Sequence, residues 1–246
     1  MVKSMETKET FVFNRIEIEG KPSIEQLISW FQNKMYKEDY GLGFTSITNE
    51  DGIIVAQILF RSPSYIQHYN AANGLFEKQV INIYGELELL YDIDNNMIYT
   101  TSSQTKFAKA KTLLRESIKS RITFSNIEFS AKTMFEKVQK MGFMPFITDL
   151  TIKQFKYKEG AMGRYSVHLD DKDLGYELLD SYSDSINRMT VQVQSNKYPD
   201  FILSIASQNS LTIKCREENL WPIINDLKSY LYWKINIITG MNGISK

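Results

Sequence analysis

The chain has 246 residues, of which 43% are hydrophobic and 24% are charged, so it can bury a sizeable core. Its 29 basic and 29 acidic residues cancel, which argues against a role carried mainly by phosphate contacts. The only cysteine, Cys215, excludes an intramolecular disulfide and fits a reducing compartment. A polar, charged N-terminus and the lack of a long apolar run predict a cytoplasmic protein with no signal peptide and no membrane segment.

The first half of the chain predicts an α+β unit. Ser23 with Gln26 three residues later forms a capping box, and Asp51-Gly52 between two apolar runs is a hairpin signal. The expected elements are, in chain order, a strand at 10–19, a helix capped by Ser23, strands at 43–49 and 53–61, a polar and aromatic loop at 62–74, strands at 78–84, 87–92 and 97–101, and a helix capped by Ser103.

The second half predicts a similar series. Ser130 is placed to cap a helix that Gly142 stops, and Pro222 lies in the first turn of the last helix or inside it. The expected elements are a strand at 122–129, a helix capped by Ser130, strands at 146–157 and 162–169, a polar, acidic segment at 170–185, strands at 189–194, 201–206 and 211–215, and a final helix that carries Ile223, Ile224, Leu227 and Leu231.

The order of elements therefore repeats. At an offset of 111 residues, the strand 13–18 aligns with 124–129, and Leu27 aligns with Val138. We interpret the chain as an internal duplication with a first α+β repeat at residues 10–120 and a second at residues 121–246. The predicted fold class is α+β, with two tandem β-α-β-β-β-β-β-α repeats.

One segment carries a family resemblance. Residues 87–118 predict a strand, a tight turn at Asn95-Asn96, a second strand, and a helix that opens at Ser102-Ser103-Gln104. In a duplicated chain this series resembles the TATA-box-binding-protein-like fold. The resemblance implies one curved antiparallel sheet with the helices on one face. That architecture hosts DNA binding, protein adaptors and enzymes alike, so the resemblance implies no functional residue.

Positive charge gathers in the middle of the chain, where residues 104–158 hold twelve basic and four acidic side chains. Lys111, Arg115 and Lys119 recur every four residues and would share one face of the helix expected there. Such a face could bind phosphates or simply be solvated. The candidate nucleic-acid-binding residues are Lys106, Lys109, Lys111, Arg115, Lys119 and Arg121.

A second candidate surface is the expected loop at 62–74, which is rich in tyrosine and amide side chains that suit protein interfaces. The acidic segment at 170–185 falls at the same point of the second repeat, so the two are interpreted as paired rim loops. The candidate partner-binding residues are Tyr65, Gln67, His68, Tyr69 and Asn70.

No pattern predicts a catalytic residue, a metal ligand or a cofactor. Asp200 and Lys214 resemble part of a nuclease metal site, but Thr212 stands where a second carboxylate is needed. The acidic residues 170–173 lack the register of a calcium loop, and Cys215 in a predicted strand is interpreted as a core residue.

Together these observations predict a non-enzymatic binding or adaptor protein that acts within a protein or protein–nucleic acid complex. Overall neutrality favours a protein partner, while the basic segment keeps nucleic acid as a possible one. The alternative is a metal-dependent nuclease that uses Asp200 and Lys214.

Overall fold

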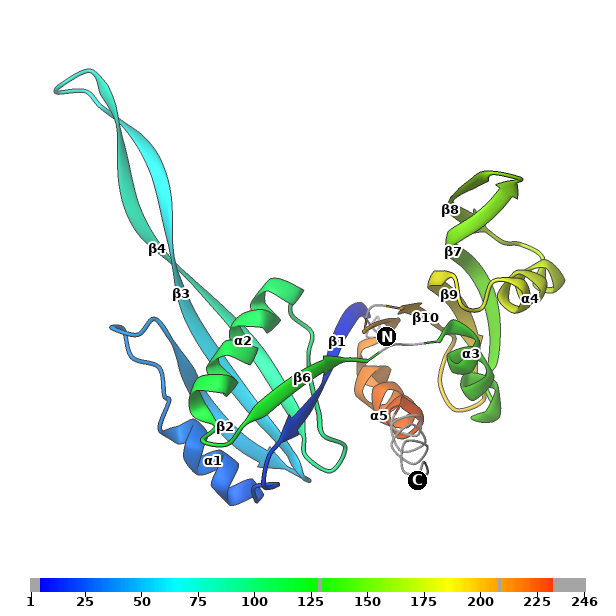
Figure 1. Ribbon diagram of the computed structural model, residues 1–246, viewed down its shortest axis with the longest axis horizontal. Coiled ribbons are helices and arrows are strands. Elements are labelled where there is room, and N and C mark those ends of the chain that lie inside the picture. The colour runs from blue at the N-terminus through cyan, green and yellow to red at the C-terminus, as the bar shows by residue number, and fades with distance from the viewer. Residues whose placement is uncertain (1–4, 128–129, 208, 232–246) are drawn as a thin grey trace. The chain divides into compact units, whose positions relative to one another are not determined.

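The computed structural model describes residues 5–127, 130–207 and 209–231 of an α+β protein (Figure 1). The strands are β1 (Glu6–Ile18), β2 (Leu42–Glu50), β3 (Ile53–Asn70), β4 (Leu75–Asp92), β5 (Met97–Thr100), β6 (Ile122–Asn126), β7 (Met144–Lys158), β8 (Ala161–His168), β9 (Ile186–Gln194), β10 (Phe201–Ala206) and β11 (Ser210–Arg216). The helices are α1 (Ile24–Gln32), α2 (Gln104–Ser117), α3 (Ala131–Lys140), α4 (Lys172–Ser181) and α5 (Leu220–Leu231), with a 3-10 turn η1 (Glu217–Asn219). Residues 128–129 of the strand expected at 122–129, and residues 232–246 of the expected second repeat, lie outside the described ranges.

Hydrogen bonds link the strands in the order β2-β3-β4-β5-β1-β11-β10-β9-β7-β8, and β6 pairs with β1. Neighbouring strands run antiparallel, as in the β3–β4, β7–β8 and β10–β11 hairpins. The chain divides into two compact units. We call residues 12–125 the N unit, and residues 126 onward together with the start of β1 the C unit.

The N unit packs α1 and α2 against its strands. Along β3, every second residue from Ile54 to Phe60 is buried, which is the alternation expected of a strand with one covered face. The helices contribute Leu27 and Phe31 from α1 and Phe107 from α2 to the same apolar cluster. The predicted capping box is confirmed, because the Ser23 hydroxyl accepts from the Gln26 N–H and the Gln26 side chain accepts from the Ser23 N–H.

The C unit is built in the same way from β7 to β11 and three helices. Buried residues such as Val191, Leu203 and Ile213 line one face of its strands, and Ile223 and Leu227 of α5 are buried as well. Phe11, at the start of β1, meets Trp221 of α5 edge to face at 5.9 Å between ring centroids. Ser130 caps α3 as predicted.

The expected loop at 62–74 is wrong. These residues form the outer part of β3 and the turn into β4, and the strands expected at 78–84 and 87–92 are one strand. Both faces of a two-stranded ribbon contact solvent, so its residues do not alternate between apolar and polar in the way that reveals a half-buried strand. Pro63 lies beyond the part of β3 that pairs with β2, at an edge position that tolerates proline.

The expected acidic loop at 170–185 is also wrong, because it holds α4. The Asp171 carboxylate caps this helix by accepting from the N–H groups of Asp173 and Leu174, and Leu179 is buried. Acidic residues are favourable at a helix N-terminus, so the cluster that resembles a loop in sequence is a helix start. The two segments interpreted as paired rim loops are therefore a hairpin and a helix. Within the described ranges, no helix has the length and apolar character needed to cross a membrane.

Candidate functional site

The most prominent surface feature of the N unit is the outer part of the β3–β4 hairpin, residues 61–84, which we call the arm (Figure 1). β3 pairs with β2 only as far as Phe60, and β4 pairs with β5 only from Leu90 to Asp92. The strand pairing of the arm, as far as the structure describes it, is between its own two strands. The arm therefore presents two open strand edges, which are the usual sites of β-strand addition.

Aromatic and aliphatic side chains cover the arm. Tyr65 is 69% exposed, Tyr69 57% and Phe76 73%. Tyr69 lies directly opposite Phe76 in the register, and their ring centroids are 5.4 Å apart. Exposed large apolar side chains also include Leu75, Val80, Ile83 and Tyr84. Tyr65, Val80, Tyr69, Phe76 and Tyr84 share one face of the arm, whereas Leu75 and Ile83 lie on the other. Exposed apolar side chains gathered on one face are typical of an interaction surface.

The tip of the arm is held by its own side chains. The side-chain amides of Asn70 and Asn73 both donate to one oxygen of Glu77, each at 2.7 Å, and the Gly74 N–H donates to the Asn70 carbonyl at 2.9 Å. These hydrogen bonds lower the pKa of Glu77 below its usual value, with Asn73 as the largest cause. His68 approaches the other oxygen of Glu77 at 3.5 Å. The tip is thus a defined turn, and the paired rings of Tyr69 and Phe76 lie beside it on the opposite face.

The base of the arm is fixed by the segment between α1 and β2. Glu38 accepts hydrogen bonds from Arg61 at 2.9 Å, from the Tyr84 hydroxyl at 2.6 Å and from the Tyr36 hydroxyl at 2.9 Å. The hydrogen bond from Tyr84 is the largest cause of the lowered pKa of Glu38, and it raises the pKa of Tyr84 in turn. The Arg61 N–H also donates to the Gly41 carbonyl at 2.7 Å. One carboxylate therefore ties both strands of the arm to the N unit.

On the other face of the base, Phe60 covers Gly85, its direct partner in β4. A Cβ at Gly85 would lie 2.4 Å from the Phe60 ring, so only glycine lets the ring occupy this position. The Lys109 amine of α2 lies 4.2 Å from the centroid of the same ring and donates to the Ser62 hydroxyl at 2.6 Å. Lys106 of α2 donates to the Glu86 carbonyl at 3.1 Å.

The basic residues predicted to share one face of a helix do not all lie on that helix. α2 ends at Ser117, whose hydroxyl donates to the Leu113 carbonyl at 2.6 Å, and Ile118 is buried with an extended backbone. Lys119 and Arg121 are exposed but lie beyond the helix, so the expected helical face shared by Lys111, Arg115 and Lys119 is wrong.

Four of the six candidate nucleic-acid-binding residues are engaged inside the N unit. Besides Lys106 and Lys109, Lys111 donates to the buried Asn14 at 3.1 Å, and Arg115 lies over the Phe124 ring at 4.8 Å. Burial, with a smaller effect of Arg115, lowers the pKa of Lys111. The cations of α2 therefore brace the helix against β1, β3, β4 and β6.

All five candidate partner-binding residues lie on the arm, but on both of its faces. Directly opposed residues share a face and neighbours in a strand alternate, so Tyr65, Gln67 and Tyr69 share one face. His68 and Asn70 lie on the other face, within the tip network. The sequence reading missed the β4 side, including Phe76. The signal that could have found it is Asn73-Gly74, a hairpin dipeptide between two strand-forming segments.

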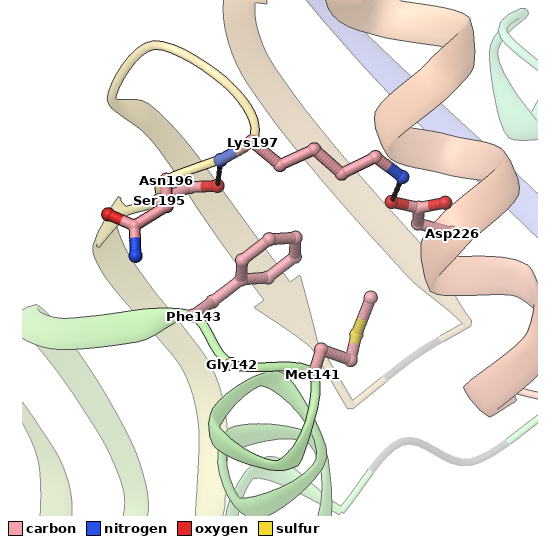
Figure 2. Close-up of a pocket in the computed structure, with 7 residues that line it drawn as sticks. All are labelled: Met141, Gly142, Phe143, Ser195, Asn196, Lys197 and Asp226. Atoms are coloured by element: carbon pink, nitrogen blue, oxygen red, sulfur yellow. Dashed lines mark hydrogen bonds and ion pairs between the residues drawn. The ribbon is translucent and has the colours of Figure 1, made fainter.

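A pocket of about 420 Å³ lies in the C unit (Figure 2). Its lining residues are Met141, Gly142, Phe143, Ser195, Asn196, Lys197 and Asp226. Figure 2 shows the Lys197 side chain reaching across to Asp226, with Phe143 and Met141 pointing into the space beneath it. Lys197 and the Tyr198 hydroxyl contact the same oxygen of Asp226, at 2.6 and 2.8 Å, and the hydrogen bond with Asp226 raises the pKa of Lys197. Lys197 and Asp226 therefore form an ion pair at the wall of the pocket.

The residues of the nuclease alternative are not joined into a metal site. Lys214 forms an ion pair with Glu6 of β1 at 3.0 Å, and Asp200 is exposed just before β10. Among the described residues, no group of three or more His, Cys, Asp or Glu side chains is placed to hold a metal ion. Cys215 is buried in β11, as interpreted, and burial raises the pKa of its thiol.

No family model matches the chain, and no curated protein matches it significantly.

Proposed function

We propose that the protein is a non-enzymatic binding protein that docks onto a protein partner through the arm and acts as an adaptor within a complex. The observation that carries this proposal is the exposure of Tyr65, Tyr69 and Phe76 on a hairpin that is braced at both its tip and its base. Aromatic side chains dominate the energy of many interfaces, and a backbone that is already ordered loses little entropy on binding.

The chemistry of the arm favours a protein partner over nucleic acid. Besides tyrosines, the ionisable side chains of the arm are Arg61, which forms an ion pair with Glu38 at the base, and His68, Glu77 and Lys78. A surface with so little positive charge gains little from phosphates. Its rings, aliphatic side chains and open strand edges instead suit an uncharged, apolar groove in which a strand edge can pair. We expect the partner to provide such a groove.

The test is site-specific photocrosslinking with the full-length chain in an extract of the organism that encodes it. Benzoylphenylalanine in place of Tyr69 should crosslink one defined protein. The same probe in place of Tyr40, which is 78% exposed in the N unit but outside the arm, should not. The triple variant Tyr65→Ala, Tyr69→Ala, Phe76→Ala should lose the crosslinked protein from an affinity purification, while Tyr40→Ala should retain it.

Two outcomes would overturn this reading. Equal crosslinking from positions 69 and 40 would show that the arm is not the docking element. A crosslink between two copies of the chain, with a dimer mass in light scattering that the triple variant abolishes, would make the partner a second copy of the protein.

We also propose that the chain consists of two tandem repeats and that it resembles the TATA-box-binding-protein-like fold. In support, β4–β5 and β10–β11 are both antiparallel pairs that lead into a helix, α2 in one case and α5 in the other. The insertion of α4 in the second half and the length of the arm in the first are departures from a strict copy. Superposition of residues 10–120 on residues 121–236 in a crystal structure tests it, and fewer than four shared elements in the same topology would refute it.

A further inference from the structure

The C unit carries a second, shorter hairpin with a different chemistry. β8 is the last strand in the sheet order, and β7 pairs with β9 only as far as Ile152 opposite Ile186. Beyond that point β7 and β8 continue together to a turn at Glu159-Gly160. We call residues 153–165 the basic hairpin.

This hairpin carries four cations and one acidic residue. The cations are Lys153, Lys156, Lys158 and Arg164, and the acidic residue is Glu159. All four cationic residues are exposed, and none of them forms an ion pair or a cation–π contact within the part of the chain that the structure describes. The lysines of α2, by contrast, donate hydrogen bonds to atoms of their own unit. The N–H donors of the basic hairpin are therefore available to a ligand.

Rings and an apolar side chain lie among these cations. Tyr157 is 80% exposed and Met162 is 72% exposed. Phe155 stacks on Tyr165 with 4.4 Å between ring centroids and packs against Tyr182 at 5.2 Å. In the register, Lys156 lies opposite Met162 while Phe155 lies opposite Gly163, so a cationic face with Lys156 and Arg164 backs onto a stacked aromatic face.

We propose that the basic hairpin is a binding site for single-stranded nucleic acid. Proteins that bind single strands combine cations that follow the phosphates with exposed rings on which bases stack. Lys156 and Arg164 supply cations on one face, and Lys158, opposite Ala161, supplies one beside the turn. Tyr157, exposed between the two lysines, supplies the ring. The site is separate from the arm and does not depend on the function proposed for it.

Fluorescence anisotropy of the full-length protein with labelled oligothymidine and oligouridine tests this site. Binding should weaken with salt, with a slope of log K against log salt of about −2 to −3 for three or four phosphates. The triple charge reversal Lys156→Glu, Lys158→Glu, Arg164→Glu should lower affinity at least about tenfold. Tyr157→Ala should lower it about tenfold through loss of a base stack.

The matched control reverses the same number of charges at three exposed positions elsewhere, Lys21→Glu, Lys37→Glu and Lys140→Glu, and should bind normally. The arm variant Tyr65→Ala, Tyr69→Ala, Phe76→Ala should also bind normally. Circular dichroism and a thermal melt establish that each variant is folded.

Three results would overturn the proposal. These are no binding at low salt by the unmodified protein, an equal loss in the control reversal, and binding to phosphatidylserine vesicles but to neither oligonucleotide. The last result would assign the hairpin to an anionic membrane surface.

Discussion

Lys109 lies over the ring of Phe60, with its amine 4.2 Å from the ring centroid, and so joins α2 to the residue just before the arm. The same amine donates to Ser62, the next residue but one in β3. A lysine that in sequence belongs to a basic, phosphate-binding pattern is thus part of the brace that holds the arm on the sheet.

Lys109→Met should lower the free energy of unfolding by about 1 kcal/mol, because the cation–π contact and a hydrogen bond are lost while the aliphatic stem is kept. Urea denaturation measures this, and amide hydrogen exchange should accelerate in the arm first. The control Lys119→Met, at an exposed position, should stay within about 0.5 kcal/mol of the unmodified protein. Equal effects of the two variants would show that Lys109 is not a brace.

Gly85→Ala should be destabilising by about 1–3 kcal/mol, because the new methyl group would lie 2.4 Å from the Phe60 ring and force it aside. The cause can be isolated with a double-mutant cycle. In a Phe60→Ala background the same Gly85→Ala change should cost much less. A cost that is the same in both backgrounds would place the strain elsewhere.

Acid should loosen the base of the arm. The folded-state pKa of Glu38 is lowered, so its contribution to stability is complete above the unfolded value of about 4.3 and is lost as pH falls through the folded pKa. Stability of the unmodified protein should therefore fall on the acid side more steeply than that of Glu38→Gln. Carbon-detected NMR titration of Glu38 measures the shift directly. Glu19→Gln controls for the loss of one charge, and a Glu38 midpoint at or above the unfolded value would contradict the geometry.

The thiol of Cys215 should react slowly with a disulfide reagent such as dithionitrobenzoate. Burial in β11 removes it from solvent and raises its pKa, so little thiolate is present near neutral pH. The reaction rate should rise with urea in parallel with unfolding. Fast, stoichiometric labelling of the native protein would show that β11 opens locally.

Sequence patterns predicted the elements that bury one face. The capping box at Ser23 and the hairpin at Asp51-Gly52 are both confirmed, because local chemistry and apolar periodicity agree at those points. The arm and α4 were not predicted. In the arm neither face is covered, so alternation gives no signal, and in α4 the acidic N-cap resembles a loop.

The candidate site also contains residues that could be predicted from the sequence and residues that could not. Tyr65 and Tyr69 could be named from residue type alone, since exposed aromatics in a polar segment suggest an interface. The structural roles of the α2 lysines could not be predicted from the sequence, because their partners Ser62, Glu86 and Asn14 lie between 20 and 97 residues away in the chain. Only the fold decides whether a cation meets a ligand or a neighbour.

The ladder of the arm also makes its length adjustable. The ten residues from Arg61 to Asn70 span about 33 Å at the usual rise of a strand, and their pairing partners lie within the arm itself. Removing two opposed pairs would shorten its reach by about 7 Å and leave every remaining side chain on its original face. The arm can therefore change in length by steps of two residues without any change in the core. Each step would change the distance between the N unit and a partner bound at the tip.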